Sequence, residues 1–140
     1  MKSYVLLIAA LVFILDRILK MLTAECCLWF FCIKQSFNKG AAFGILPGMT
    51  WLFVAAGIVV FALVAFFYLK IKNKKQKNLK FSLALIAAGT LGNLIDRLFY
   101  GYVIDMLSFT FMPRWHGFNV ADAANIIGAL LLLIYLLKKK

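Results

Sequence analysis

The sequence predicts an all-α integral membrane protein with four transmembrane helices, and three observations lead to this fold class. Of the 140 residues, 65% are hydrophobic and only 15% are charged, whereas soluble globular domains are about 45–50% apolar and about 25% charged. Four apolar stretches approach the roughly 20 residues that a helix needs to cross the hydrocarbon core. The chain has sixteen Lys and Arg and only five Asp and Glu. Such an excess of positive charge is found in nucleic-acid-binding proteins, but the high apolar fraction of this chain argues against that class. The same apolar fraction excludes a disordered chain.

The four predicted spans cover residues 4–22, 49–69, 81–95 and 118–137. They use more than half of the chain, so we expect a single membrane-embedded domain over residues 1–140. The first span begins like a secretory signal peptide, but Asp16, Arg17 and Lys20 interrupt it and no A-x-A cleavage pattern follows. We therefore expect the first span to remain as an uncleaved helix.

The positions of the lysines predict the orientation of these spans. Six lysines lie in residues 70–80 with no acid among them, one is Lys2, and three occupy residues 138–140. These ten of the sixteen basic residues fall on one side of a four-span arrangement, and the positive-inside rule makes that side cytoplasmic. Both termini are then cytoplasmic, and the loops 23–48 and 96–117 face outward. Because topology accounts for the basic residues, no nucleic-acid partner is expected.

The two outward loops contain stretches that favour short β-strands. Residues 28–37 and 103–112 are rich in β-branched and aromatic side chains. The aromatic residues near the expected membrane interface are Trp29, Phe30, Phe31, Phe109, Phe111, Trp115 and Phe118. Aromatic belts are common at that depth, so we expect these side chains to lie at the outer membrane surface.

Three cysteines lie in or near the first outward loop, at Cys26, Cys27 and Cys32. Their number is odd and no histidine accompanies them at metal-ligand spacing. Small apolar loop residues or one disulfide are the favoured interpretations. A catalytic thiol would need a basic partner, and the only histidine is His116. No metal or cofactor is expected.

The acids are few, and four of the five lie at the predicted outer membrane boundary: Asp16, Asp96, Asp105 and Asp122. Acids at this depth are costly and mark functional sites by default. Asp16 has Lys20 one helical turn later and Asp96 is followed by Arg97, so for these two acids an ion pair is an equal alternative. A transporter that uses the acids as a proton relay would spread them through the membrane depth, which this sequence does not do.

Asp105 and Asp122 differ from the other acids because neither has a basic residue within one turn on its own segment. Two carboxylates brought together at a half-buried boundary would not both ionise easily, so the pair would share a proton near neutral pH. Such a pair can activate water and protonate a leaving group, which suits amide hydrolysis without a metal. Asn119 lies one turn before Asp122, on the same face of the predicted helix. A non-catalytic membrane scaffold is the remaining alternative, and in it both acids would be replaceable.

Five short blocks in the sequence carry a resemblance to a known family. They are DRILK at 16–20, NKGAAFG at 38–44, GNLIDR at 92–97, VID at 103–105 and FNVAD at 118–122. With these blocks in this order on the predicted spans, the chain resembles the bacterial lipoprotein signal peptidases (signal peptidase II, prolipoprotein signal peptidase), a family of four-span aspartic proteases. The resemblance covers the whole chain. Two features depart from it: Met106 stands where many relatives have Phe, and residues 113–117 match no family motif.

The resemblance implies a function and a set of site residues. Asp105 and Asp122 match the catalytic dyad. The supporting and substrate-binding positions implied are Asp16, Lys20, Asn38, Gly40, Asn93, Asp96, Arg97 and Asn119. The substrate implied is a prolipoprotein with a diacylglyceryl group on a cysteine, cleaved on the amino side of that cysteine, and globomycin-type inhibitors are expected to block the site.

The resemblance also implies a location and a setting for the site. The protein is expected to be a monomer in the bacterial inner (cytoplasmic) membrane, among membrane lipids, with its site near the outer face under an extracytoplasmic platform that contains short β-strands. The small run from Gly40 to Ala42 would let a peptide backbone approach, and Phe43 would offer an apolar wall to a lipid chain. A simple turn into the second span is the alternative interpretation of this run.

Overall fold

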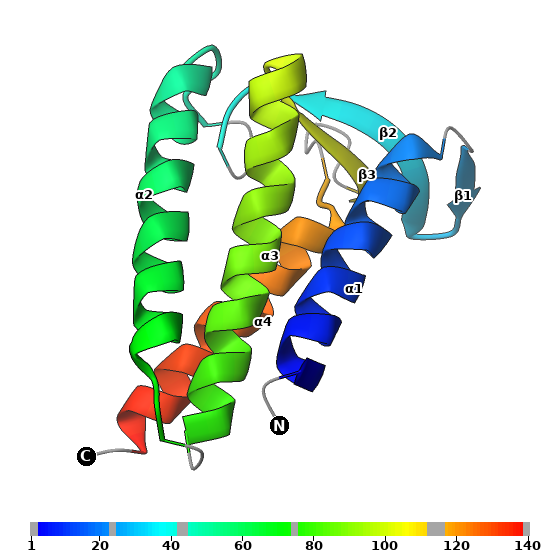
Figure 1. Cartoon of the computed structure of the whole chain (residues 1–140). Helices are drawn as coiled ribbons and strands as arrows, with labels where there is room; N and C mark the ends of the chain where they lie inside the picture. Colours follow the sequence, from blue (N-terminus) through cyan, green and yellow to red (C-terminus); the bar gives the residue numbers. More distant parts are fainter. Residues whose placement is uncertain (1–2, 23–24, 42–44, 74–75, 112–116, 139–140) are drawn as a thin grey trace.

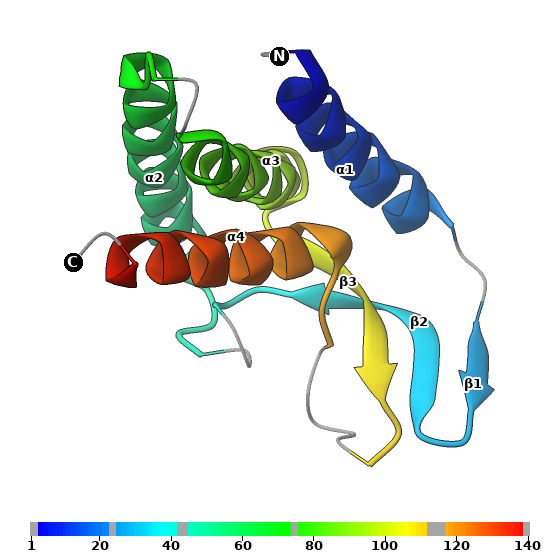
Figure 2. The same cartoon turned by 90° about the horizontal axis from the view of Figure 1, so that it is seen from below.

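The computed structural model describes residues 3–22, 25–41, 45–73, 76–111 and 117–138. It contains four helices and three strands, which in chain order are α1 (Ser3–Met21), β1 (Cys26–Leu28), β2 (Phe31–Asn38), α2 (Thr50–Lys70), α3 (Lys77–Tyr100), β3 (Val103–Phe109) and α4 (Val120–Leu137). The sheet lies at one end of the helices, and the start of α1 and the end of α4 lie toward the other end (Figure 1). Seen along its axis, α3 is surrounded by the other three helices (Figure 2).

Within the described residues, three helices are long and apolar enough to cross a membrane: α2, α3 and α4. These helices lie at the positions of the second, third and fourth predicted spans. The helix α1 occupies the position of the first predicted span, but it carries Asp16, Arg17 and Lys20 near its end. Half of the apolar stretch of α3 is buried (50%), against 11% for α2 and 17% for α4. The core of the molecule therefore lies along α3.

Two helix boundaries differ from the sequence prediction. The helix α3 runs from Lys77 to Tyr100, whereas the predicted span covered only 81–95. Hydropathy identifies only the apolar part of a helix, but the helical hydrogen bonds continue through the polar residues at both ends. It ends at Gly101, which adopts the left-handed conformation (φ 78°) and donates its N–H to the Arg97 carbonyl. The helix α4 begins at Val120, not at residue 118, because Asn119 is extended and acts as its N-cap.

Small residues bring α3 and α4 into close contact. A Cβ at Gly89 would lie 2.3 Å from the Ala121 carbonyl oxygen, and one at Gly128 would lie 2.9 Å from the Ser82 carbonyl oxygen. Glycine at these positions lets the two backbones approach, as is common where membrane helices pack. This packing places the first turn of α4 beside the middle of α3.

The three strands form one antiparallel sheet in the order β1-β2-β3. It confirms the prediction of strands over 28–37 and 103–112, although the β1–β2 turn falls inside the first range and residue 112 lies outside the described residues. The β2–β3 register places Asp105 opposite Ser36 and Val103 opposite Asn38. The sheet thus holds Asp105 and Asn38 next to the ends of the helices.

Candidate active site

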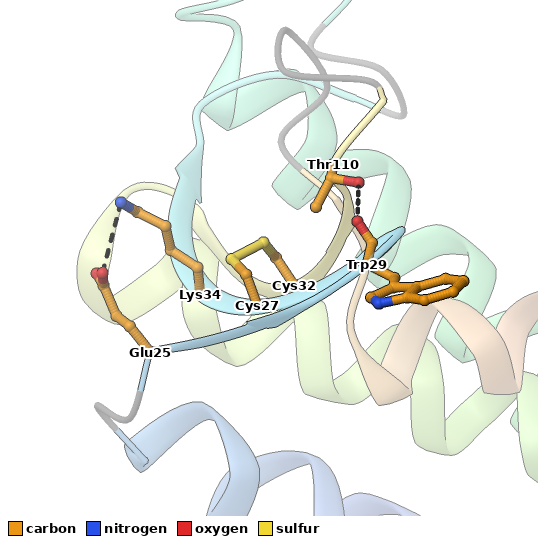
Figure 3. Close-up of a disulfide and its surroundings, with 6 residues drawn as sticks. All are labelled: Glu25, Cys27, Trp29, Cys32, Lys34 and Thr110. Atoms are coloured by element: carbon orange, nitrogen blue, oxygen red, sulfur yellow. Dashed lines mark hydrogen bonds and ion pairs between the residues drawn. A yellow bond between two sulfur atoms is a disulfide. The ribbon is translucent and has the colours of Figure 1, made fainter.

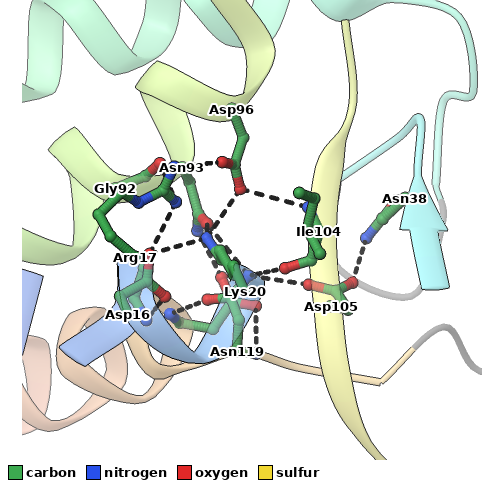
Figure 4. A network of polar contacts seen from close by, with 12 residues as sticks. Asp16, Arg17, Lys20, Asn38, Gly92, Asn93, Asp96, Ile104, Asp105 and Asn119 are labelled. Carbon is green, nitrogen blue, oxygen red and sulfur yellow. Dashed lines mark hydrogen bonds and ion pairs between the residues drawn. The ribbon is translucent and has the colours of Figure 1, made fainter. Parts of the chain in front are cut away.

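A buried cluster of four charges joins α1 to α3. Arg17 contacts Asp96 at 2.6 Å and Asp16 at 2.8 Å, and the Lys20 ammonium contacts Asp16 at 2.9 Å and Asp96 at 2.8 Å (Figure 4). The cluster contains two positive and two negative charges, so it is balanced, which is what allows charges to be buried at this depth. The predicted Asp16–Lys20 pair is confirmed. The alternative pairing of Asp96 with Arg97 is wrong, since Asp96 turns to α1 and Arg97 bonds elsewhere.

The cluster also fixes the start of α4. The second Asp16 oxygen accepts the Ala121 N–H at 2.9 Å, and a Cβ at Gly92 would lie 2.9 Å from the Asp16 carboxylate. Asp96 accepts the Ile104 N–H at 3.2 Å. The four charges therefore hold α3, β3 and α4 together, and these elements carry Asn93, Asp105 and Asp122.

Two asparagines connect this cluster to Asp105 and Asp122. The Asn93 carbonyl oxygen accepts from Lys20 at 3.1 Å and from the Asn119 amide at 3.1 Å, while the Asn93 amide donates to Asp122 at 2.6 Å. The Asn119 amide also donates to Asp105 at 2.8 Å. Asn119 is fully buried, so its side chain has a fixed position between the two acids.

Asp105 lies on β3 and is buried, with 1% of its surface exposed. It accepts hydrogen bonds from Asn119 at 2.8 Å and from the Asn38 amide at 3.3 Å. Burial, and then the nearby charge of Asp122, raises the pKa of Asp105 from its ordinary value of 3.8 to about 7, against the opposing effect of the two amides and Lys20. The shift predicted for an interacting pair of carboxyls is therefore present at Asp105.

Asp122 lies in the first turn of α4 and is tied to Asn119 in both directions. The Asn119 side chain accepts the Asp122 N–H at 2.8 Å, and the Asp122 carboxylate accepts the Asn119 N–H at 3.4 Å. This reciprocal pair is a capping box. The same asparagine thus bonds Asp105 through its amide and Asp122 through its carbonyl oxygen and backbone.

A cavity of about 230 Å³ opens beside Asp122, lined by Asn38, Ala41, Asn93, Arg97, Val103, Gly117, Phe118, Asp122, Asn125 and Ile126. Arg97 donates to the Gly40 carbonyl at 3.0 Å and lies over the Phe53 ring at 5.2 Å. Asn38 accepts the Gly40 N–H at 2.9 Å. Arg97 and Asn38 therefore lie in the cavity wall and hold Gly40 of the adjoining loop, while Asp105 is not among the lining residues and bonds to Asn38.

The structure brings all ten predicted site residues into one connected region, and it adds two that sequence reasoning missed. Arg17 is the second cation of the buried cluster, and its place beside Asp16 in the first predicted span was a usable signal. Asn125 lines the cavity one turn after Asp122 and accepts from Thr90 at 3.3 Å. A polar residue within the apolar fourth span was the signal for Asn125.

Several expectations fall on residues that the structure does not describe: Ala42, Phe43, Trp115, His116 and the segment 113–116. In the described ranges, no group of three or more His, Cys, Asp or Glu side chains is arranged to hold a metal ion.

Cys27 and Cys32 form a disulfide across the β1–β2 hairpin, while Cys26 is free and exposed. Figure 3 shows this disulfide beside the exposed Lys34–Glu25 pair and the Thr110 hydroxyl, which donates to the Trp29 carbonyl at 2.8 Å.

Comparison with known proteins places this geometry in a family. The profile of the family described as signal peptidase (SPase) II matches residues 8–138. The lipoprotein signal peptidase of Halothermothrix orenii is 46% identical over 99 residues, covering 71% of this chain and 65% of the relative. That of Desulfitobacterium hafniense is 44% identical over 108 residues, covering 77% of this chain and 70% of the relative.

Two solved structures of bacterial membrane enzymes have a similar fold. One superposes with a TM-score of 0.84 at 31% identity, covering 97% of this chain and 88% of the other. The second gives a TM-score of 0.82 at 30% identity and covers 99% and 95% of the two chains. The sequence matches and the shared fold agree, and the chain belongs to the signal peptidase II family.

Proposed function

We propose that this protein is an intramembrane aspartic endopeptidase that removes the signal peptide from diacylglyceryl-modified prolipoproteins, cleaving on the amino side of the lipidated cysteine. The observation that carries the proposal is the attachment of Asp105 and Asp122 to one buried asparagine, Asn119. The two acids come from different elements, and their environments differ: Asp105 is enclosed, while Asp122 borders the cavity. Unequal environments of this kind separate the acid and base roles of two carboxyls.

In the proposed mechanism the two carboxyls hold one proton between them. The ionised carboxylate takes a proton from a water molecule as the water oxygen attacks the scissile carbonyl carbon. The protonated carboxyl gives its proton to the carbonyl oxygen, which forms a neutral tetrahedral diol. Collapse of the diol breaks the C–N bond. The carboxyl that took a proton from water gives it to the leaving amine, and the other carboxylate takes a proton from the diol. The products are a carboxylic acid and the amine of the lipidated cysteine.

The supporting residues have distinct proposed roles. Asn119 and Asn93 orient the two carboxyls through the bonds described above, and Lys20 anchors Asn93 at 3.1 Å. Asn38 bonds both Asp105 and the Gly40 N–H, so it links the dyad to the loop that would meet the substrate backbone. Arg97 holds the same loop by its Gly40 contact. The charged cluster of Asp16 and Asp96 holds the backbone of α4 and β3 through the Ala121 and Ile104 N–H groups.

We propose that α1 also crosses the membrane, which together with α2, α3 and α4 gives four membrane spans. The large apolar side chains of α1 are exposed: Tyr4, Leu6, Leu7, Leu11, Ile14, Leu15 and Ile18. Its Asp16 and Lys20 are buried, with 1% and 3% exposed, so they are turned away from lipid. A helix that is apolar outside and polar inside can cross a membrane despite three charges.

The positive-inside rule then gives the orientation and the setting. The lysine-rich end of the helices faces the cytoplasm with both termini, and the sheet and the site lie near the outer face of the bacterial inner membrane. The exposed aromatic side chains of the sheet, Trp29, Phe30 and Phe111, suit a platform at the membrane interface. The chain acts as a single domain and a monomer, and globomycin-type compounds inhibit it by occupying the cavity.

The test is cleavage of a diacylglyceryl-modified precursor peptide by the purified protein in detergent. Asp105→Asn and Asp122→Asn should each lose at least about 10³-fold in rate, since each removes one of two groups that act as a unit. Glu25→Gln, which alters an exposed acid of the sheet, is the matched control and should keep full activity. Thermal unfolding of each variant verifies the fold. Cleavage retained in both dyad variants would rule out the assignment, and strong inhibition by a chelator would contradict a metal-free reaction.

A further inference from the structure

The start of α3 and the end of α4 lie at the end of the helices opposite the sheet (Figure 1). Residues of these two helix ends line a second cavity. Its volume is about 410 Å³, and its lining residues are Asn78, Phe81, Leu131, Ile134, Tyr135 and Lys138. This volume falls in the range of about 300–1,000 Å³ that is typical of small-molecule sites. No residue of this cavity belongs to the candidate active site.

The cavity changes from polar to apolar along the helix axes. Asn78 lies in the first turn of α3 and Lys138 caps the end of α4, so both are at the outer rim. Phe81 and Ile134 lie about one turn further in, and Leu131 is deeper still. The site therefore presents a polar rim and an apolar wall to one occupant, which is the pattern that an amphiphile matches.

The charge at this end has a single sign. The described lysines there are Lys70, Lys72, Lys77, Lys80 and Lys138. All five acids of the chain lie toward the sheet, in α1, just before β1, at the end of α3, in β3 and at the start of α4. Lys70 and Lys80 lie over the rings of Phe66 and Tyr68. Lys138 is at the cavity rim and Lys77 directly precedes Asn78, so an occupant with a negative head group is favoured.

A hydrogen bond beside the cavity joins the start of α3 to the end of α4. The Gln76 amide donates to the Tyr135 hydroxyl oxygen at 3.0 Å, which ties the start of α3 to the last turns of α4. Because Tyr135 accepts this bond, its own hydroxyl proton can be donated to an occupant. The bond fixes the positions of the two helix ends that line the cavity relative to each other.

We propose that this cavity binds one anionic phospholipid of the surrounding membrane. Its phosphate lies at the rim among Lys77, Asn78 and Lys138, and one acyl chain lies along the apolar wall of Phe81, Ile134 and Leu131. Basic pockets between membrane helices bind acidic lipid head groups in this way. A free phosphate ion would satisfy the lysines but leave the apolar wall uncovered. The site is separate from the peptidase reaction and does not depend on it.

Binding is measured by native mass spectrometry and by titration of phosphatidylglycerol into phosphatidylcholine nanodiscs that contain the full chain. We expect one phosphatidylglycerol to remain bound per chain in mild detergent, and phosphatidylcholine to be lost. Each lysine contributes about fivefold to affinity, so Lys77→Gln/Lys138→Gln should weaken phosphatidylglycerol binding about 25-fold. Lys34→Gln/Lys72→Gln removes the same charge from residues that do not line the cavity, and it should change phosphatidylglycerol binding less than about twofold.

Three results would overturn the proposal. Equal loss in both double variants would mean diffuse attraction and no site, and equal retention of phosphatidylcholine would mean that the head-group charge does not matter. Displacement of the lipid by inorganic phosphate at millimolar concentration would identify a free anion as the occupant. Loss of precursor cleavage in the dyad variants with lipid binding intact would show that the two sites are separate.

Discussion

Replacing Lys20 by methionine tests whether the buried charges hold the site together. The cluster contains Asp16 and Asp96 against Arg17 and Lys20, so its formal charge is balanced. Methionine has a similar length to lysine but carries no charge. The Lys20→Met variant therefore leaves one excess negative charge on Asp16 and Asp96, whose side chains are at most 1% exposed.

The expected loss of stability follows from the contacts of Lys20. Its ammonium lies 2.9 Å from Asp16 and 2.8 Å from Asp96, and these three side chains are at most 2% exposed. Removing one partner from a buried ion pair costs about 3–5 kcal/mol, because the other charge is left uncompensated. The exposed pair between Lys34 and Glu25, 3.6 Å apart with 58% and 64% of the side chains exposed, should contribute less than about 1 kcal/mol.

The free energy of unfolding is measured in mixed micelles at increasing mole fractions of SDS, followed by far-UV circular dichroism. Lys34→Met is the matched control, since it makes the same substitution at an exposed pair. The double variant Lys20→Met/Asp16→Asn restores charge balance, and asparagine keeps an oxygen for the Ala121 N–H that Asp16 now accepts at 2.9 Å. We expect the double variant to recover at least half of the loss.

Two outcomes would refute this reasoning. If Lys20→Met costs no more than Lys34→Met, the buried charges do not stabilise the fold in the way their contacts indicate. If Asp16→Asn deepens the loss in the Lys20→Met background, charge balance is not the controlling quantity.

Four further predictions test the site and its packing. Because the pKa of Asp105 is raised to about 7, protonation of Asp105 stabilises the folded protein below pH 4, and this stabilisation is lost as the pH rises through 7. The thermal midpoint of the wild type should therefore fall relative to that of Asp105→Asn between pH 4 and pH 7. A difference between the two proteins that does not change with pH would contradict the shift. Cleavage should decline above pH 7 as the dyad of Asp105 and Asp122 loses its shared proton, and an activity that stays flat to pH 9 would argue against it. Gly89→Ala should lower stability by about 1–3 kcal/mol through overpacking against a backbone carbonyl of α4 2.3 Å away, whereas Gly57→Ala, with its nearest neighbour at 3.4 Å, should be neutral in the same SDS titration. Asn125→Leu should raise the KM for the precursor more than it lowers kcat, because it makes the cavity wall apolar, and an unchanged KM would exclude a contact with substrate.

Much of the fold was predictable from the order of residues alone. Hydropathy located α2, α3 and α4 because a membrane helix is defined by a continuous apolar stretch, which is a one-dimensional property. The Asn119–Asp122 capping box is also local, since the two residues are three positions apart on one helix. These features require no knowledge of how the helices pack.

The parts that failed or stayed open depend on contacts between distant segments. Asp96 bonds Arg17 across 79 positions of sequence, where a neighbour-based argument paired it with Arg97. Asn125 was missed because a single asparagine in an apolar helix has no fixed direction until that helix packs. The choice of Cys27 and Cys32 for the disulfide depends on the hairpin register, which the sequence alone left open.

The sequence by itself determined a membrane protein with few acids, most of them near one end of its helices. Composition and apolar length suffice for this, because they reflect only the transfer of side chains from water to lipid. The tertiary structure decided which residues those acids contact. It places Asp16 and Asp96 in a neutralised cluster and joins Asp105 and Asp122 through Asn119. That division depends on the rotation and close approach of α1, α3 and α4, which glycines such as Gly92 permit, and no local pattern in the chain encodes it.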